Sequence, residues 1–441
     1  MPTSASKSAQ HHVLVLGAYG LIGSAIARRL RDDGCVVVGL GRNAQTAQSV
    51  LPDIEWLIYD LGDLCSENAW DPLLADIDTV VNCAGGLQQS ARDDLDVVHH
   101  QAVKELVRTC RQTGTGLVQI SAVGAHAEAS TPFMRTKASG DALVRDAGIN
   151  HWIFRPGMVL APTAYGGSTL LRMLAAFPLV QPLACPDAVM QTLSLSDLAN
   201  AVAMAVRGEI PKRTECDLVE DTGHSLRDVV AANRRWLGFA PARYEIVMPR
   251  FLLSLTSGVA DVLGLLGWRS PLRSSAVQVL TEGVVGDPEQ WTELGGPHLS
   301  SMDETLNAMP ATVEDRLFAR MALMMPFAIA TLFVFWLVSG IVGFFQISKA
   351  AQVLENIGWS HGMATTSVAF WSVVDIAIAL ALLVRKHAAR SCWAMVAVSM
   401  IYLASATFTV PQLWSDPLGP LVKILPAIML ALVARAMLET R

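Results

Sequence analysis

Four apolar stretches near the C-terminal end restrict what this chain can fold into. They cover residues 326–345, about 364–384, 392–410 and about 418–438, and each is close to the roughly 20 residues that a helix needs to cross a bilayer. Because a bilayer offers no water to backbone N–H and C=O groups, such stretches must form helices. Apolar residues make up 52% of the chain and charged residues 16%, as in membrane proteins. The sequence therefore predicts a four-helix transmembrane bundle at residues 313–441.

The basic residues around these stretches predict their orientation. Basic side chains collect at one set of span ends, namely Arg316, Arg320, Arg385, Lys386, Arg390, Arg435 and Arg441. The opposite ends carry little beyond Lys349 and Lys423. Since loops rich in Lys and Arg stay in the cytoplasm, the residues before the first span are predicted to be cytoplasmic.

Residues 248–268 form a fifth apolar segment, MPRFLLSLTSGVADVLGLLGW. Asp261 lies near its centre, where an ionisable residue is costly in a span, and basic residues flank both ends. A fifth span would also put the N-terminal domain and the basic loops on conflicting sides. These features favour a helix in a soluble lobe, or one that lies on the membrane surface.

Cysteine, histidine and charge patterns argue against several kinds of site. The 7 cysteines and 10 histidines form no CxxC or HExxH motif, so neither a disulfide framework nor a metal site is predicted, and a reducing compartment fits best. A net charge of −6 without a basic tract argues against nucleic acid as a partner. The polar N-terminus shows no signal-peptide segment, so the first domain is expected to stay on the side where it is made.

Short runs rich in Val and Ile alternate with helix-forming segments in the N-terminal third. The runs cover residues 12–17, 35–41, 54–60, 79–85, 117–122 and 151–157. Apolar strands separated by helices are typical of a parallel sheet covered on both faces. The pattern predicts an α/β, Rossmann-like, doubly wound domain at residues 1–160. After residue 160 the alternation of strands and helices is less regular, and residues 161–312 are expected to form a small substrate lobe that contributes a late strand and helices.

The turn after the first run, GAYGLIG, has glycines at three-residue spacing. Gly17 permits a tight turn, Gly20 lets backbone amides approach a pyrophosphate, and Gly23 lets the helix pack closely on the strand. Its position between a predicted strand and a predicted helix favours dinucleotide binding over a purely structural turn. The residues of this turn expected to contact the dinucleotide are Gly17, Tyr19, Gly20, Leu21, Ile22 and Gly23.

Residues after the later strands extend the predicted dinucleotide site. The second strand ends in GLGRN, which offers no acidic residue to hydrogen-bond an NAD ribose. Arg42 in this segment suits a 2′-phosphate instead, so NADP(H) is favoured over NAD(H). The alternative is that Arg42 is a solvated loop residue. Asp60 is placed to meet the adenine amino group, or it caps a nearby helix. The other residues expected to line the cofactor are Leu61, Cys83, Ala84, Gly85, Lys137 and Pro156.

Five motifs together resemble the extended and atypical branch of the short-chain dehydrogenase/reductase superfamily, which includes epimerase/dehydratase-like proteins and an accessory subunit of respiratory complex I. They are GAYGLIG, NCAGG, the QIS that ends in Ser121, TKASGDALV with Lys137, and FRPG. The four apolar stretches, with WSDPLGPLVKILP at 414–426, resemble a DoxX-like membrane domain. Bacterial proteins that join these parts form a recognisable family. The resemblance therefore implies a multi-pass protein of the bacterial inner membrane.

In active members of the superfamily, a Tyr four residues before the Lys acts as acid or base, the Lys holds the nicotinamide ribose, and a Ser orients the substrate carbonyl. The resemblance makes Ser121 and Lys137 the candidate catalytic residues, but Phe133 stands at the Tyr position. A phenyl ring cannot exchange a proton. Lys137 is thus expected to bind the cofactor without its catalytic partner; the alternative is a solvated lysine.

Two other side chains could supply the missing proton donor. Tyr165, in AYGGS, is the one plausible phenol among the remaining tyrosines, and His126 lies in the loop after Ser121. Imidazoles exchange protons near neutral pH. His99 and His100 are expected to be packing or solvated residues.

Asp375 falls near the middle of the second predicted span. An ionised carboxylate there is costly, so a functional or paired role is expected. Lys423 is the candidate partner, unless its side chain extends outward to the interface. The DoxX resemblance also implies quinone-associated chemistry.

Together these features predict a membrane-anchored NADP(H)-binding protein of the short-chain dehydrogenase/reductase type, a possible oxidoreductase whose catalytic apparatus is impaired or atypical. Two alternatives stay open. One is a noncatalytic NADPH-binding structural or redox-sensing subunit with a quinone, respiratory or other membrane-protein partner. The other is an epimerase or dehydratase that acts on a lipid-linked substrate.

Overall fold

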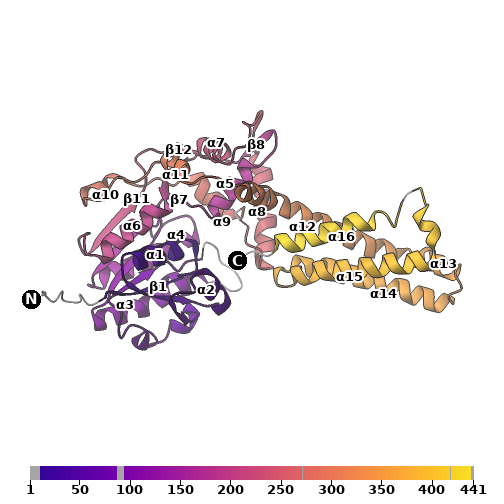
Figure 1. The fold of residues 1–441 in the computed structure, drawn as a ribbon, viewed down its shortest axis with the longest axis horizontal. Coiled ribbons are helices and arrows are strands. Elements are labelled where there is room, and N and C mark those ends of the chain that lie inside the picture. The colour runs from indigo at the N-terminus through magenta and orange to yellow at the C-terminus, as the bar shows by residue number, and fades with distance from the viewer. Residues whose placement is uncertain (1–9, 87–93, 271, 418, 439–441) are drawn as a thin grey trace, which may run out of the picture. The chain divides into compact units, whose positions relative to one another are not determined.

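The computed structural model describes residues 10–86, 94–270, 272–417 and 419–438, which form two compact units. The first unit holds the described residues up to Gly258 and from Leu272 to Arg316, and the second holds Val259–Ser270 and those from Leu317 onward. Strands and helices alternate through the first half of the chain (Figure 1). Arg441, which entered the orientation argument, lies outside the described residues.

Seven strands form one sheet among the described residues of the first unit, in the order β11-β6-β5-β4-β1-β2-β3. They are β1 (His12–Leu16), β2 (Val36–Gly41), β3 (Glu55–Ile58), β4 (Thr79–Asn82), β5 (Gly116–Ile120), β6 (His151–Pro156) and β11 (Thr214–Leu218). Every neighbouring pair is parallel. The chain winds outward in both directions from the junction of β1 and β4, and ligands of such sheets bind at the carboxyl end of this junction. The predicted doubly wound, Rossmann-like sheet is confirmed.

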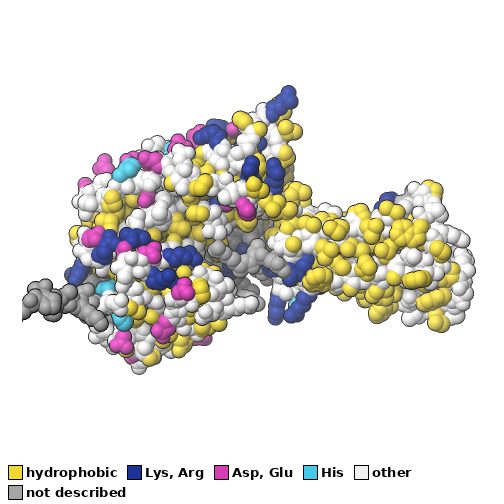
Figure 2. All heavy atoms as spheres, in the orientation of Figure 1, with side chains coloured by type: hydrophobic (Ala, Val, Ile, Leu, Met, Phe, Trp, Pro, Cys, Tyr) yellow, Lys and Arg dark blue, Asp and Glu magenta, His cyan; other side chains and the backbone are white. Residues whose placement is uncertain are grey.

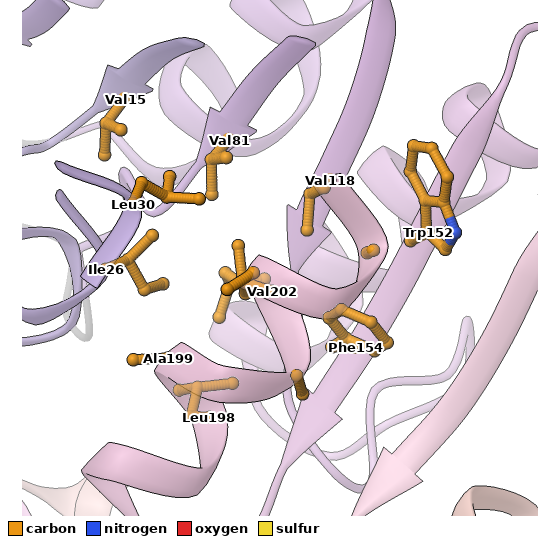
Figure 3. Packing of buried hydrophobic residues seen from close by; sticks show 14 of the residues in the cluster. Val15, Ile26, Leu30, Val81, Val118, Trp152, Phe154, Leu198, Ala199 and Val202 are labelled. Atoms are coloured by element: carbon orange, nitrogen blue, oxygen red, sulfur yellow. The ribbon is translucent and has the colours of Figure 1, made fainter. Parts of the chain in front are cut away.

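The two faces of this sheet are covered by different helices, because alternate strand residues point to opposite sides. Val13 and Val15 lie in one buried cluster with residues of α1 and α6, whereas Leu14 and Leu16 lie in another with residues of α3 and α4. Figure 3 shows the first cluster, in which Val202 of α6 lies close to the side chains of the strands. The helices next to the sheet are α1 (Leu21–Asp32), α2 (Ala44–Val50), α3 (Ala102–Thr113), α4 (Pro132–Asp146) and α6 (Leu195–Val206).

The remaining elements of the first unit are short. Among the described residues, three strand pairs occur outside the main sheet: β7 (Met158–Leu160) with β10 (Thr192–Ser194), β8 (Val180–Leu183) with β13 (Tyr244–Val247), and β9 (Val189–Met190) with β12 (His224–Ser225). The helices are α5 (Gly167–Ala175), α7 (Leu226–Trp236), α9 (Ser274–Glu282), α10 (Glu289–Glu293) and α11 (Met302–Ala308). Single helical turns are η1 (Leu61–Leu64), η2 (Asp71–Leu73) and η3 (Val97–Gln101), of which η3 is a π-helical turn.

The apolar segment at 248–268 contains helix α8 (Arg250–Leu265), which is too short to be counted among the candidate spans. Its small residues Ser257 and Ala260 are buried. Apolar side chains are exposed along it, including Phe251, Leu255 and Val262. This distribution is the reverse of that in a helix surrounded by water. The choice between a helix of the lobe and one on a membrane surface stays a prediction.

The second unit is helical and contains, within the described part of the chain, three helices long and apolar enough to cross a membrane. These are α12 (Val313–Phe345), α14 (His361–Leu383) and α15 (Arg385–Thr409). The shorter elements are α13 (Ile347–Glu355), η4 (Pro411–Trp414) and α16 (Ile424–Met437). Hydrophobic side chains cover most of the visible surface of these helices (Figure 2), as a membrane domain requires.

The fourth predicted span is shorter than expected. Helix α16 begins at Ile424 and has 14 residues, or about 21 Å at ~1.5 Å per residue, which is less than the roughly 30 Å hydrocarbon core. Gly419 has a φ of +56°, and Pro420 follows it, so a helix cannot continue through this segment. Residue 418 itself lies outside the described residues. The prediction of a fourth full-length span is therefore wrong in its length, although α16 packs against α15.

The partners of Asp375 also differ from the prediction. Asp375 is 5% exposed, and its carboxylate accepts hydrogen bonds from the hydroxyls of Tyr402 on α15 (3.0 Å) and Ser339 on α12 (3.3 Å). Lys423 instead stands at the N-cap of α16. Of the two alternatives for Lys423, the candidate ion pair is not formed, and the carboxylate accepts instead from hydroxyl groups on α12 and α15.

Candidate functional site

The turn between β1 and α1 is built around glycines. Gly17 has a φ of +70°, in the left-handed region that favours glycine. Its N–H donates to the carbonyl of Leu40 at the end of β2 (2.9 Å), and the N–H of Gly20 donates to the carbonyl of Gly17 (2.8 Å). Gly20 is the N-cap of α1, and it supplies no side-chain cap. The N–H groups in the first turn of α1 are therefore available to an anion at the carboxyl end of the sheet.

Close backbone packing explains the other small residues around this turn. A Cβ on Gly23 would lie 2.9 Å from the carbonyl carbon of Gly17 and nearer still to its oxygen. A Cβ on Gly17 would lie 3.2 Å from Cα of Ala84, so the turn adjoins the loop after β4. Asn82 supports this loop, since its side-chain oxygen accepts a hydrogen bond from the N–H of Ala84 (3.1 Å). The structure thus brings the glycine turn together with the predicted residues of the β4 loop.

The residues expected at the adenine end also lie together. The hydroxyl of Tyr19 accepts a hydrogen bond from the N–H of Arg42 (3.3 Å), and the Tyr19 ring lies so close to Gly41 that a Cβ there would overlap it. The guanidinium of Arg42 is 3.7 Å from the carboxylate of Asp60, and both side chains are largely exposed. Asp60 also caps η1, which begins at Leu61, by accepting from the N–H of Gly62 (3.1 Å). The capping role weighed for Asp60 is therefore present.

Helix α4 presents the residues expected at the nicotinamide end. Its start is defined by Thr131, whose hydroxyl accepts a hydrogen bond from the N–H of Met134, and by a proline at the first position. Phe133, Lys137 and Asp141 follow at four-residue spacing and so lie on one face of the helix. This face adjoins the end of β5, where Lys137 donates to the carbonyl of Ile120 (2.7 Å).

Lys137 is only 6% exposed, which excludes the alternative of a solvated lysine. Burial lowers the pKa of Lys137, and the nearby Asp141 opposes this shift. A Cβ on Gly85, in the β4 loop, would lie 3.3 Å from Nζ of Lys137. The glycine therefore lets the β4 loop approach a buried amine that can donate further hydrogen bonds. Burial also raises the pKa of Cys83 in the same loop to about 12, so its thiol stays protonated.

Asp141 is a residue of the site that sequence reasoning missed. It is 2% exposed and accepts a hydrogen bond from the hydroxyl of Ser121 (2.5 Å). Burial raises the pKa of Asp141, against the opposing effects of Ser121, Lys137 and Arg155. Because the Ser121 hydroxyl has a single proton, it donates to Asp141 and not to a substrate carbonyl in this arrangement. The position of Asp141 four residues after Lys137 was the available signal.

His99 is a second polar residue beside this site. It was expected to be a packing or solvated residue, and it packs: its imidazole is 2% exposed and lies edge-on to the ring of Phe133, with 5.7 Å between ring centroids. Its Nε2 is close to Gly85, since a Cβ there would lie 3.3 Å from it. Burial lowers the pKa of His99 to about 2, and Lys137 adds to this effect. The imidazole is therefore neutral at physiological pH.

The other proton donors weighed from the sequence are more exposed. Tyr165 is 54% exposed, in the loop before α5, and His126 lies in an exposed turn after Ser121. His100 is partly exposed and lies 3.6 Å from the carboxylate of Asp96.

Pro156 is buried at the end of β6, where its carbonyl accepts from the N–H of Val123 (3.3 Å). The described residues contain no cluster of His, Cys, Asp and Glu side chains arranged to hold a metal ion.

Comparison with protein families identifies both parts of the chain. Residues 13–212 match the NAD dependent epimerase/dehydratase family, and residues 333–432 match the DoxX-like family. The protein is therefore a fusion of a Rossmann domain of the epimerase/dehydratase type with a DoxX-like membrane domain, as the resemblance implied. No curated protein shows significant sequence similarity to the chain.

Solved structures share the fold of the first unit. The Bordetella bronchiseptica enzyme WbmG in complex with NAD is 16% identical, with a TM-score of 0.53, and the match covers 69% of this chain and 94% of that chain. MoeE5 in complex with UDP-glucuronic acid and NAD is 18% identical, with a TM-score of 0.52 and coverages of 71% and 100%. The NADPH-dependent quinone oxidoreductase QOR2 of Escherichia coli, with NADPH, is 17% identical, with a TM-score of 0.51 and coverages of 67% and 99%. At such identities the similarity shows the fold alone.

Proposed function

We propose that the first unit binds a nicotinamide dinucleotide, with its pyrophosphate at the start of α1 and its nicotinamide ribose beside Lys137. The observation that carries this proposal is the glycine turn at the carboxyl end of β1, where a Cβ on Gly23 would overlap the backbone and no side chain caps the helix. The buried amine of Lys137 beside Gly85 fits a ribose hydroxyl at the other end. Fluorescence titration of the full-length protein with NADPH and NADH tests the proposal, and failure of both to bind would refute it.

The preferred nucleotide in this proposal is NADP(H). Arg42 is the cation that would meet a 2′-phosphate, and its present ion pair with Asp60 is exposed and weak enough to rearrange. The WbmG and MoeE5 structures contain NAD and the QOR2 structure contains NADPH, so relatives of this fold use both. The choice in this chain then depends on Arg42.

Arg42→Ala is expected to weaken NADPH binding roughly 10-fold, the loss of one charge-assisted phosphate contact. NADH binding should not change, because NADH lacks the 2′-phosphate. Arg31→Ala is a matched control, since Arg31 lies 3.7 Å from Asp53 with a similar exposure of the arginine. Equal weakening of NADPH and NADH by Arg42→Ala would contradict an NADP(H) site.

Any hydride transfer in this site is proposed to be slow. A bound nicotinamide would supply or accept the hydride, but Phe133 offers no proton and Ser121 already donates to Asp141. These two observations favour a noncatalytic NADPH-binding subunit over an epimerase or dehydratase of a lipid-linked substrate. The membrane unit would then hold this module at the cytoplasmic face of a bacterial inner membrane, near a quinone or respiratory partner.

Phe133→Tyr tests whether only the phenol is missing. The new hydroxyl would stand four residues before Lys137, where the amine favours ionisation of a phenol. If the site retains a reductase geometry, NADPH-dependent reduction of small carbonyl compounds and quinones should rise by about 100-fold or more over the wild type. Phe133→Leu, which removes the ring without adding a hydroxyl, is the control. Unchanged turnover with retained NADPH binding would support the noncatalytic reading.

A further inference from the structure

The hydrogen-bonding state of His99 follows from its surroundings. Nδ1 of His99 lies 2.8 Å from the hydroxyl oxygen of Thr136, and that hydroxyl donates to the carbonyl of Phe133 (3.1 Å). A hydroxyl has one proton. With that proton donated to Phe133, Thr136 accepts from His99, and the proton of the neutral imidazole is then on Nδ1. Nε2 of His99 is left with a lone pair that can only accept a hydrogen bond.

This lone pair has no partner in the described part of the chain. Nε2 of His99 is buried and makes no hydrogen bond there, although buried polar atoms nearly always make one. The π-helical turn η3 is the local cause of its position, because such a turn inserts an extra residue and rotates the following side chains relative to an α-helix. π-helical turns are frequent at functional sites.

An acceptor and a donor therefore lie beside the same position next to Gly85. A Cβ on Gly85 would lie 3.3 Å from Nε2 of His99 and 3.3 Å from Nζ of Lys137. The amine of Lys137 has three protons in its charged form, and one of them is used by the carbonyl of Ile120. A carbonyl ligand would satisfy only Lys137. A hydroxyl group both accepts and donates, and so it can satisfy Lys137 and His99 at once.

We propose that His99 and Lys137 together bind one hydroxyl group of the nicotinamide ribose, with Lys137 donating to its oxygen and His99 accepting its proton. This inference rests on the proposed dinucleotide binding and adds the residue that makes the ribose site selective for a hydroxyl. His99 acts as a hydrogen-bond acceptor. It is not a substitute acid, because its imidazole stays neutral.

Two variants of the full-length protein separate this role from packing. His99→Phe keeps an aromatic ring against Phe133 but removes the acceptor, whereas the side-chain oxygen of His99→Gln can still accept. NADPH affinity should fall roughly 10-fold in His99→Phe and stay within about 3-fold of wild type in His99→Gln. Adenosine 2′,5′-bisphosphate, which lacks the nicotinamide ribose, should bind all three proteins equally.

The possible results separate this inference from the proposed function. Three results would each overturn only the role of His99 and leave the proposed dinucleotide binding intact. They are wild-type NADPH affinity in His99→Phe, equal losses of NADPH affinity in both variants, and a parallel loss of affinity for adenosine 2′,5′-bisphosphate. Failure of the wild type to bind NADPH would refute the proposed function and this inference with it. A measurement without ligand adds a check. ¹⁵N NMR of the full-length protein should show one histidine signal with its proton on Nδ1, and this signal should be absent in His99→Phe. A proton on Nε2 of this histidine would overturn the inference.

Discussion

Gly23→Ala is expected to lower the affinity for NADPH by about 100-fold or more, equivalent to ~2.8 kcal/mol. The added Cβ would lie 2.9 Å from the carbonyl carbon of Gly17 and 3.0 Å from Cα of Ala18. These contacts are with backbone atoms, which cannot rotate away as the end of a side chain can. Helix α1 must therefore move away from β1, and its first-turn N–H groups leave the position in which they would meet a pyrophosphate. Equilibrium titration with NADPH measures the loss.

Gly258→Ala provides the control for this substitution. Gly258 lies in α8, and a Cβ there would have no atom within 4 Å. The same change in side chain should therefore leave nucleotide affinity unaltered. If Gly23→Ala and Gly258→Ala bind NADPH equally well, the glycine turn is structural and the dinucleotide site lies elsewhere.

The stability of the first unit is expected to fall as the pH drops below 6.5. Burial, with a smaller effect of Lys137, lowers the pKa of His99 from 6.5 to about 2 in the folded protein. Below pH 6.5 the unfolded chain takes up a proton at this residue and the folded protein does not, so protonation favours unfolding. The free energy of unfolding should decrease by roughly 2 kcal/mol between pH 7 and pH 5, at ~1.4 kcal/mol for each pH unit below the unfolded pKa.

His99→Gln isolates this contribution, because glutamine does not titrate. Lys137, Asp141 and the other ionisable groups are the same in both proteins, so the difference between their unfolding profiles at pH 7 and pH 5 reports on His99. The wild type should lose about 2 kcal/mol more than the variant over this interval. Parallel profiles would show that His99 is accessible to protons in the folded state, contrary to its burial.

Much of the architecture could be predicted from local patterns. The Val-rich and Ile-rich runs, the glycine spacing of GAYGLIG and the length of the apolar stretches each act over a few consecutive residues. Strand and helix periodicities therefore predicted the parallel sheet, the strand-to-helix turn and the membrane helices. Even the late start of the fourth helix was present in the sequence, since Gly419 and Pro420 interrupt a helix.

The partners of the buried polar groups could not be predicted in the same way. His99 meets Thr136 across 37 residues, and its direction depends on the π-helical turn, which no simple periodicity indicates. Asp375 meets Tyr402 and Ser339 because of how three helices are rotated about their axes. Asp141 is an intermediate case, since its spacing from Lys137 was visible but its contact with Ser121 was not.

The sequence by itself determined the classes of structure: a doubly wound α/β domain with a glycine turn, apolar membrane helices, and a lysine without its tyrosine. These features follow from residue types and short-range spacing, which act locally. Only the tertiary structure decided that Ser121 donates to Asp141, that Asp375 accepts from two hydroxyls, and that His99 and Lys137 approach one space beside Gly85. The physical reason is that a hydrogen bond needs two groups within about 3 Å, and that separation is set by packing between elements distant in the chain.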